Sequence, residues 1–313
     1  MLFLPFLLTW SLAVWSAANS HVDLTILHTN DLHSHFDGNG PDRLYTGQVG
    51  DGDPVLGQYA RLATVIKNAR KEAKGPVLLL DGGDFFGGTL YHLIAPRGDT
   101  TFNPEIDFFK MIGLDYTIFG NHEFDAREEG LATMLSKANQ TSVSFKILAT
   151  NLLLNQRAPW ASFFGVSENS LVIPRAIRQF DVKGRKIKIG LLGIIGPDAL
   201  LVCRSNRHFS HFIGFNDETN RAEFGELYQL LNREVKDLRE KEKVDVVILI
   251  AHAGNPEDEK IVKNVSGIDI FIAGHTHDLY PTPKKIGRTW IAEAGEYGKY
   301  LGVLKFALAP HGM

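Results

Sequence analysis

The chain is poor in cysteine. Cys203 is the only cysteine among its 313 residues. One thiol cannot form a disulfide within the chain, and its isolation excludes a zinc site built from several cysteines and a CxxC redox motif. Stability must therefore come from a packed core, for which 44% hydrophobic residues are sufficient, and from any metal bound by other side chains.

The chain also lacks a strong excess of charge. It contains 33 Lys and Arg residues against 36 Asp and Glu residues, which gives a formal net charge of -3. A surface with this balance does not attract a polyanion, so a nucleic-acid polymer is not an expected partner. The sequence contains no internal repeats or low-complexity tracts.

The first residues lack charge altogether. Leu2 to Ala18 is apolar, and Ser16 and Ala18 stand as small residues at positions -3 and -1 of a cleavage site. We interpret residues 1–18 as a secretory signal peptide, although no Lys or Arg follows Met1; an uncleaved anchor and an ordinary buried segment are the alternatives. The signal predicts a secreted, extracellular or periplasmic protein with no membrane span beyond this segment.

Short polar clusters are present directly after apolar runs of strand length. The runs are Leu24 to Leu27, Val77 to Leu80, Tyr116 to Phe119, Val244 to Ile250 and Ile268 to Ala273. The polar residues that follow them include Asp31, His33, Asp84, Asn121, His122, His252, His275 and His277. Ligands bind beyond the carboxyl ends of strands in layered α/β folds, so we expect these clusters to converge.

The residue types suit a pair of divalent metal ions. Imidazole favours zinc, manganese, iron or cobalt over magnesium and calcium, while carboxylate and amide oxygens offset the positive charge. The number of candidate ligands fits two ions better than one. Two ions about 3.5 to 4 Å apart can hold a phosphoryl group and lower the pKa of a bound water, which then becomes a nucleophile at neutral pH.

The ordered blocks resemble the calcineurin-like metallophosphoesterases, and more closely the catalytic N-terminal domain of the 5'-nucleotidase family. The matching blocks are Ile26 to His35, Asp81 to Asp84, Gly120 to Asp125, Ala149 to Leu152, Ala251 to Gly254 and Gly295 to Gly302. The resemblance runs from about residue 24 to residue 306. It implies a four-layer α/β/β/α sandwich, whereas periodicity alone predicts only an α/β fold.

The resemblance also implies a role for each site residue. One metal would be held by Asp31, His33 and His277, the other by Asn121, His252 and His275, with Asp84 bridging the two. His122 and Asp125 would form a catalytic dyad. The ring of His122 can stabilise or protonate an oxygen of the substrate, and Asp125 can fix the tautomer of that ring.

Each residue taken alone has an ordinary alternative. Asp31 and Asn121 are common at helix caps and turns, Asp84 lies in a Gly-rich turn, and a histidine such as His252 at the end of a buried strand is often structural. For His275 and His277, the alternative to metal binding is that two histidines lie near each other on the surface by chance. The family does not assign four nearby residues to the metals, and we treat them as supporting or structural: His28, His35, Asp37 and Glu123.

The rest of the sequence predicts one catalytic domain over residues 22–308. Arg61 to Lys74 and Arg221 to Lys241 have helical spacing, and three further strands complete the sheets, at Ile187 to Ile194, Thr289 to Glu293 and Leu301 to Leu308. Asp37 to Pro54 reads as a loop that either overhangs the site or has no role. Residues 309–313 would begin the linker or second domain that full-length 5'-nucleotidases carry.

These observations predict a secreted, dinuclear metal-dependent phosphoesterase whose substrate is a nucleotide or another small phosphoester. The alternative, from a different class, is a secreted nucleotide- or phosphate-binding protein without turnover, or an inactive truncated fragment. This alternative arises because the second domain, which supplies most nucleoside recognition in the family, would only begin at residues 309–313. Without it the substrate would be poorly oriented, and orientation contributes strongly to catalysis.

Overall fold

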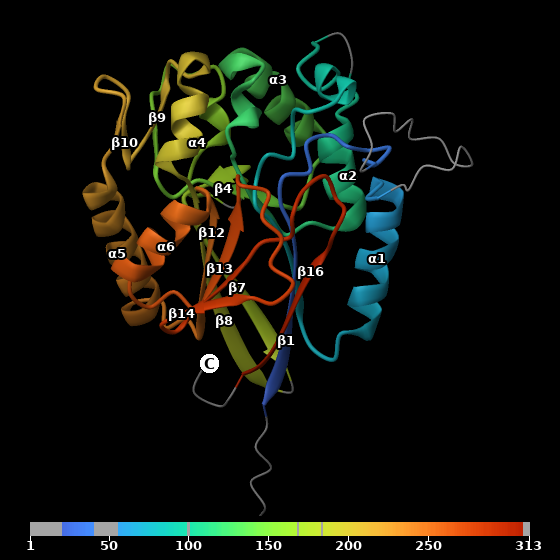
Figure 1. Ribbon diagram of the computed structural model, residues 1–313, viewed down its shortest axis with the longest axis vertical. Coiled ribbons are helices and arrows are strands. Elements are labelled where there is room, and N and C mark those ends of the chain that lie inside the picture. The colour runs from blue at the N-terminus through green and yellow to red at the C-terminus, as the bar shows by residue number, and fades with distance from the viewer. Residues whose placement is uncertain (1–20, 41–55, 99–100, 168, 183, 309–313) are drawn as a thin grey trace, which may run out of the picture.

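The computed structural model describes residues 21–40, 56–98, 101–167, 169–182 and 184–308 (Figure 1). The predicted signal peptide, the residues interpreted as the start of a following domain and most of the Asp37 to Pro54 loop lie outside these ranges. Within them, none of the helices combines the length and apolarity needed to cross a membrane.

The first sheet has six strands in the order β16-β1-β2-β3-β4-β6. All pair in parallel except β16, which is antiparallel to β1. The strands are β1 (Val22–Thr29), β2 (Val77–Asp81), β3 (Tyr116–Ile118), β4 (Lys146–Leu148), β6 (Val172–Ile173) and β16 (Gly302–Leu308).

The second sheet also has six strands, in the order β14-β15-β13-β12-β8-β7. Its four inner strands are parallel, and β7 and β14 are antiparallel edges. The strands are β7 (Arg175–Val182), β8 (Arg185–Ile195), β12 (Val246–His252), β13 (Ile270–Gly274), β14 (Lys284–Ile286) and β15 (Thr289–Ala292).

Helices cover the outer face of each sheet (Figure 1). On the first sheet lie α1 (Tyr59–Glu72), α2 (Pro104–Ile112) and α3 (Arg127–Gln140). On the second lie α5 (Phe224–Glu240) and α6 (Asn255–Asn264), while the short α4 (Pro197–Val202) follows β8. Single turns of 3-10 helix occur at Leu90–Leu93, His122–Phe124, Ala161–Phe163 and Arg204–Asn206.

Alternating side chains of the strands fill two layers of the core. In β12, Ile248 and Ile250 pack between the sheets, whereas Val247 and Leu249 pack under α5 and α6, and all four are fully buried. A strand with both faces covered is apolar throughout, which explains the unbroken hydrophobic runs in the sequence. The predicted α/β/β/α sandwich is confirmed.

The boundaries of some elements differ from those predicted. Helix α5 begins at Phe224 instead of Arg221 because Arg221–Ala222 forms β11, which pairs with β10 (Phe215–Asn216). Strand β12 continues to His252, which pairs with Gly274 on one side and with Ile195 on the other. His252 is therefore held in the ladder itself. A further two-stranded ladder joins β5 (Leu152–Leu154) to β9 (Ser210–Phe212).

Candidate metal centre

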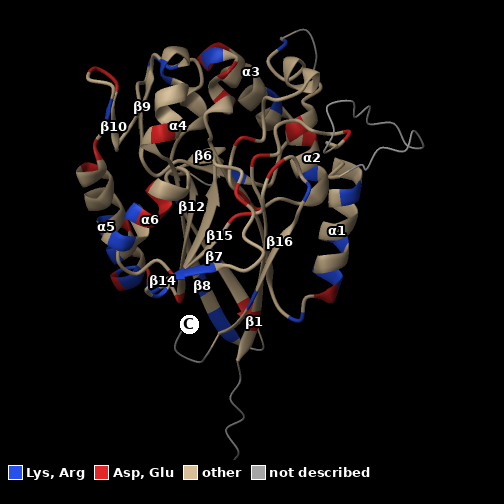
Figure 2. Ribbon diagram, in the orientation of Figure 1, with Lys and Arg blue, Asp and Glu red and all other residues tan. Residues whose placement is uncertain are grey.

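The polar clusters converge where the parallel strands of both sheets end. The loops after β1, β2 and β3 meet those after β12 and β13, and acidic residues gather in these loops (Figure 2). Ligand atoms lie within 4.8 Å of one another in three overlapping groups: Asp31, His33 and His277; His33, Asp84 and His122; and Asp84, His252 and His275. The convergence expected from strand position therefore occurs.

We call Asp31, His33 and His277 the first group. Nε2 of His277 lies 3.4 Å from an oxygen of Asp31 and 3.1 Å from Nε2 of His33. Burial lowers the pKa of His33 to about 4, against the opposing pull of Asp84 and Asp31, so its ring is neutral at pH 7. A neutral imidazole with a free lone pair is the form that binds a metal ion.

We call Asp84, His252 and His275 the second group. Nε2 of the fully buried His252 lies 3.1 Å from Oδ2 of Asp84 and 3.2 Å from Oδ1 of Asn121. Oδ2 of Asp84 is also 3.8 Å from Nε2 of His33. A single carboxylate oxygen thus lies between the two groups.

The backbone of the centre is strained. Asp84 has a φ of 50°, and His275 reaches 92°, in a region that residues other than glycine rarely adopt. Such conformations cluster at functional sites. A positive φ is found in five of the seven predicted metal-binding residues: Asp31, His33, Asp84, His275 and His277.

Close approach of the loops also requires glycine. A Cβ on Gly120 would lie 2.2 Å from Oδ1 of Asp84, and one on Gly274 would lie 2.8 Å from the carbonyl oxygen of Gly82. Both contacts are shorter than atoms tolerate, so a side chain at either position would push the loops apart.

His122 and Asp125 form the predicted pair. Nδ1 of His122 lies 2.6 Å from Oδ2 of Asp125, while the backbone N–H of His122 donates to Oδ1 of Asp84 at 2.8 Å. The hydrogen bond from Asp125 raises the pKa of His122 to about 9, so the ring carries a proton at neutral pH. The ring of His122 stands edge-on to that of His33 at 4.9 Å, which places it beside the centre.

Glu123 makes hydrogen bonds that the sequence did not predict. Its buried carboxylate accepts hydrogen bonds from the backbone N–H groups of Asp84 at 3.1 Å, Phe86 at 3.1 Å and Gly120 at 2.5 Å. The first two amides belong to the loop after β2 and the third to the loop after β3. Glu123 therefore ties together the loops that carry Asp84 and Asn121.

Replacing Glu123 by alanine is expected to destabilise the metal-free protein by about 3 kcal/mol or more, because each buried amide left without an acceptor costs about 1 to 3 kcal/mol. Urea unfolding followed by circular dichroism measures the change. Glu240→Ala, on the exposed side of α5, is the matched control and should shift stability by less than about 0.5 kcal/mol. Equal stability of the two variants would contradict the role of Glu123.

Three supporting residues escaped the sequence prediction. Asn30 donates to Oδ2 of Asp31 at 2.7 Å and to the Gly295 carbonyl at 2.6 Å. Glu296 contacts His277, and Asp198 contacts His275. Asn30 and Glu296 lie inside recognised blocks, and Asp198 follows the strand predicted at Ile187 to Ile194, so the rule of polar residues after strands would have found Asp198.

All four residues that we treated as supporting or structural lie outside the groups; Glu123 is described above, and the other three have contacts of their own. His28 is buried, where a Cβ on Gly302 would clash with it, and burial lowers its pKa to about 4. His35 stacks on Tyr297 at 3.9 Å, and Asp37 accepts a hydrogen bond from Tyr91. Their contacts are structural ones around the centre.

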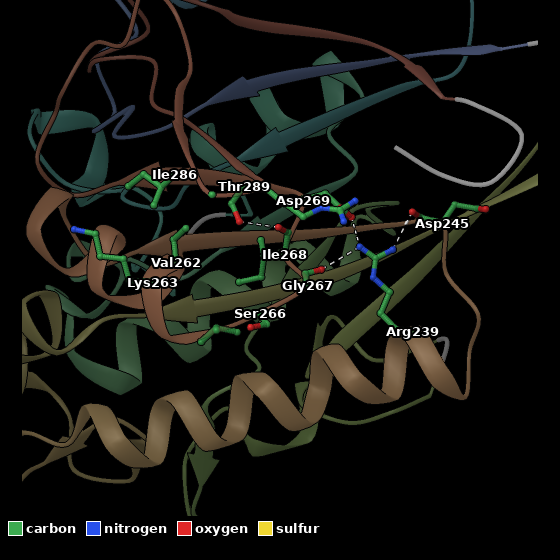
Figure 3. Close-up of a pocket in the computed structure, with 13 residues that line it drawn as sticks. Arg239, Asp245, Val262, Lys263, Ser266, Gly267, Ile268, Asp269, Ile286 and Thr289 are labelled. Carbon is green, nitrogen blue, oxygen red and sulfur yellow. Dashed lines mark hydrogen bonds and ion pairs between the residues drawn. The ribbon is translucent and has the colours of Figure 1, made fainter.

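A separate hollow of about 690 Å³ lies at the opposite ends of the strands (Figure 3). Its walls include Ile268 and Asp269, which precede β13, and Thr289, the first residue of β15. Arg239 in its wall is engaged by the carbonyls of Val244, Asp245 and Gly267 and by Asp269. That arginine joins strand ends and is not available to a ligand.

The sandwich fold and the donor groups at its strand ends define a metal-dependent phosphoesterase architecture. The family model of calcineurin-like phosphoesterases matches residues 24–279, a range that contains every predicted metal-binding residue. The chain belongs to this family, so the resemblance predicted from the sequence blocks is confirmed. Calcineurin-like phosphoesterases use a pair of divalent metal ions.

Relatives extend the match across the chain. It is 29% identical to the trifunctional nucleotide phosphoesterase protein YfkN of Bacillus subtilis, over 93% of this chain and 18% of that protein. It is also 29% identical to the 5'-nucleotidase of Rattus norvegicus, over 94% of this chain and 48% of the relative. The chain thus spans less than half the length of these curated relatives.

A solved structure with the same fold is the 5'-nucleotidase precursor from Thermus thermophilus. It superposes with a TM-score of 0.70 at 24% identity and covers 93% of this chain and 52% of that one. At this identity the similarity establishes the fold alone.

Proposed function

We propose that residues 22–308 form a catalytic domain that hydrolyses phosphate esters with two divalent metal ions. The observation that carries the proposal is the position of Asp84, whose Oδ2 faces His252 of the second group at 3.1 Å and His33 of the first at 3.8 Å. The proposed first metal site consists of Asp31, His33 and His277, the second of Asn121, His252 and His275, and Asp84 belongs to both.

The donor set suits such ions. Asp31 and Asp84 are at most 2% exposed, and their ion-pair partners among the described residues are histidines of the same centre. Buried carboxylates of this kind require a compensating positive charge. Mixed nitrogen and oxygen donors without cysteine fit zinc, manganese, iron or cobalt.

The ions, when bound, supply Lewis acidity and a bound water of lowered pKa. The chain's own contribution is positioning and proton transfer. Asp125 holds the ring of His122 through Nδ1, which leaves Nε2 free to hydrogen-bond an oxygen of the phosphoryl group or to protonate the departing alkoxide. Glu123 keeps the loops of Asp84 and His122 at a fixed spacing.

Replacing Asp125 by asparagine is expected to slow turnover about 10- to 100-fold without loss of metal, since a partner that orients a functional histidine is commonly worth that much. Turnover and metal content of the same purified sample measure the two effects. Unchanged turnover would remove Asp125 from the dyad, and loss of metal would make it part of the metal sites.

We infer that the substrate is a nucleotide. Support comes from relatives that are named 5'-nucleotidase and nucleotide phosphoesterase. Phosphate release from AMP, ADP, a UDP-sugar, a cyclic nucleotide and an aryl phosphate tests this class. Turnover of a nucleotide in preference to the aryl phosphate supports the proposal, whereas stoichiometric nucleotide binding without phosphate release would favour the alternative of a binding protein.

We further propose that the protein is exported through residues 1–18. Support comes from the apolar, uncharged run and the small residues at its end. N-terminal sequencing of protein recovered outside the producing cell should begin at Asn19. A protein that stays inside the cell with Met1 intact would contradict export.

A further inference from the structure

The loop from Gly274 to His277 presents two histidines to two different groups. His275 belongs to the second group and His277 to the first, although they are only two residues apart. Their φ angles of 92° and 59° place both in the left-handed region. Each ring then meets a carboxylate from another part of the chain.

The two carboxylates engage opposite nitrogens. Oδ2 of Asp198 lies 3.1 Å from Nε2 of His275, whereas Oε2 of Glu296 lies 2.5 Å from Nδ1 of His277. A neutral imidazole has one N–H and one lone pair, and a carboxylate takes the N–H. His275 is thereby left with a lone pair on Nδ1, and His277 with a lone pair on Nε2.

The surroundings of His277 agree with this division. Its Nε2 is the atom that lies 3.4 Å from Asp31 and 3.1 Å from His33, so the nitrogen left free by Glu296 faces the first group. Lys299 donates to the other oxygen of Glu296 at 2.8 Å and holds that carboxylate in place.

Asp198 reaches His275 from α4, the short helix that follows β8, and β8 contributes no predicted ligand. Strand β8 ends at Ile195, and Gly196 passes so close to Ala253 that a Cβ there would lie 2.4 Å from the Cβ of Ala253. Pro197 then begins α4, and the backbone N–H of Asp198 donates to Glu257 of α6 at 3.3 Å. Asp198 is thus fixed at its backbone, while its side chain is 63% exposed against 14% for His275.

We propose that Asp198 and Glu296 are positioning residues, each of which sets the affinity of one metal site by fixing the tautomer and direction of one histidine. Asp198 acts on the second site through His275, and Glu296 acts on the first site through His277. The inference rests on the metal sites assigned under the proposed function. Outer partners of metal-binding histidines are commonly worth about 10- to 100-fold in metal affinity. Because solvent screens Asp198, we expect its effect on metal affinity to lie near the lower end of this range, about tenfold.

Cobalt binding to metal-stripped protein, followed by visible absorption, tests the inference in two single-site backgrounds. His277→Ala weakens the first site and isolates the second, whereas Asn121→Ala weakens the second and isolates the first. Adding Asp198→Ala should lower cobalt affinity about tenfold in the His277→Ala background and leave it unchanged in the Asn121→Ala background. Adding Glu296→Ala should lower it only in the Asn121→Ala background.

Two controls separate positioning from a general effect on the fold. Asp198→Asn keeps an oxygen that can accept from Nε2–H of His275 and should restore most of the affinity. Asp237→Ala, which removes a partly exposed aspartate paired with Lys241 on α5, should change cobalt affinity in neither background. An Asp198→Ala effect that is absent, or equal in both backgrounds, overturns the inference while the metal sites stand. Fewer than two cobalt ions on the unaltered chain would overturn the proposed function itself.

Discussion

Replacing Asp84 by alanine is expected to abolish paired-metal binding and phosphoester hydrolysis together. The side chain has one oxygen between the two groups, 3.1 Å from His252 and 3.8 Å from His33, and the other accepts the backbone N–H of His122 at 2.8 Å. Its loss therefore removes a shared ligand and also the anchor of the residue proposed as proton donor. We expect turnover to fall by at least about 100-fold, as when a single preorganised electrostatic group is removed.

Metal content measured by elemental analysis should fall below two ions per chain in the same variant. Asp81 offers a matched control because it is equally buried, ends the strand β2 and accepts hydrogen bonds from Thr29, Thr117 and Gly83 without joining any metal-binding group. Asp81→Asn should lower stability but retain two ions. An Asp84→Ala protein with normal turnover and two ions would refute the proposed centre.

Replacing His122 by alanine should also reduce turnover, at least tenfold, but unlike Asp84→Ala it should retain both metals. A positioned general acid or electrostatic group commonly contributes about 10²- to 10⁴-fold, so tenfold is a low threshold. The reason is the geometry of the ring, which is held by Asp125 at 2.6 Å and stands beside His33. Turnover and metal content are measured on one sample.

The metal content decides between two roles for this histidine. Its ligand atom also groups with those of His33 and Asp84, so loss of an ion from His122→Ala would make it a metal ligand. His211 is the matched control, because its Nδ1 pairs with Asp217 at 2.7 Å in the same manner but away from the centre. His211→Ala should leave both turnover and metal content unchanged.

Much of the fold and the convergence of the site could be predicted because local patterns determine them. Strands buried on both faces are largely apolar, so β2, β12 and β13 were recognised as hydrophobic runs, and the polar residues after them had to meet at the ends of parallel strands. The order of these blocks was enough to identify the family. Helix α5 begins later than predicted because Arg221 and Ala222 pair with an earlier strand, and helical spacing does not reveal such pairing.

Contacts between distant loops could not be predicted in the same way. Nothing local to Glu123 shows that it accepts three amides, two of them from the loop after β2. The orientation of each histidine depends likewise on partners far along the chain: Gly82 for His252, lying 170 positions away, and Asp198 for His275. Such partners are set by tertiary packing, which one sequence does not reveal.

Whether two metal ions drive phosphoester hydrolysis is tested by phosphate release from a nucleotide and an aryl phosphate with metal-stripped protein, before and after refilling with zinc, manganese or cobalt. We expect no release from stripped protein and restored release once two ions are bound per chain. Release that persists without metal, or silence in the presence of two bound ions, would contradict a dinuclear phosphoesterase.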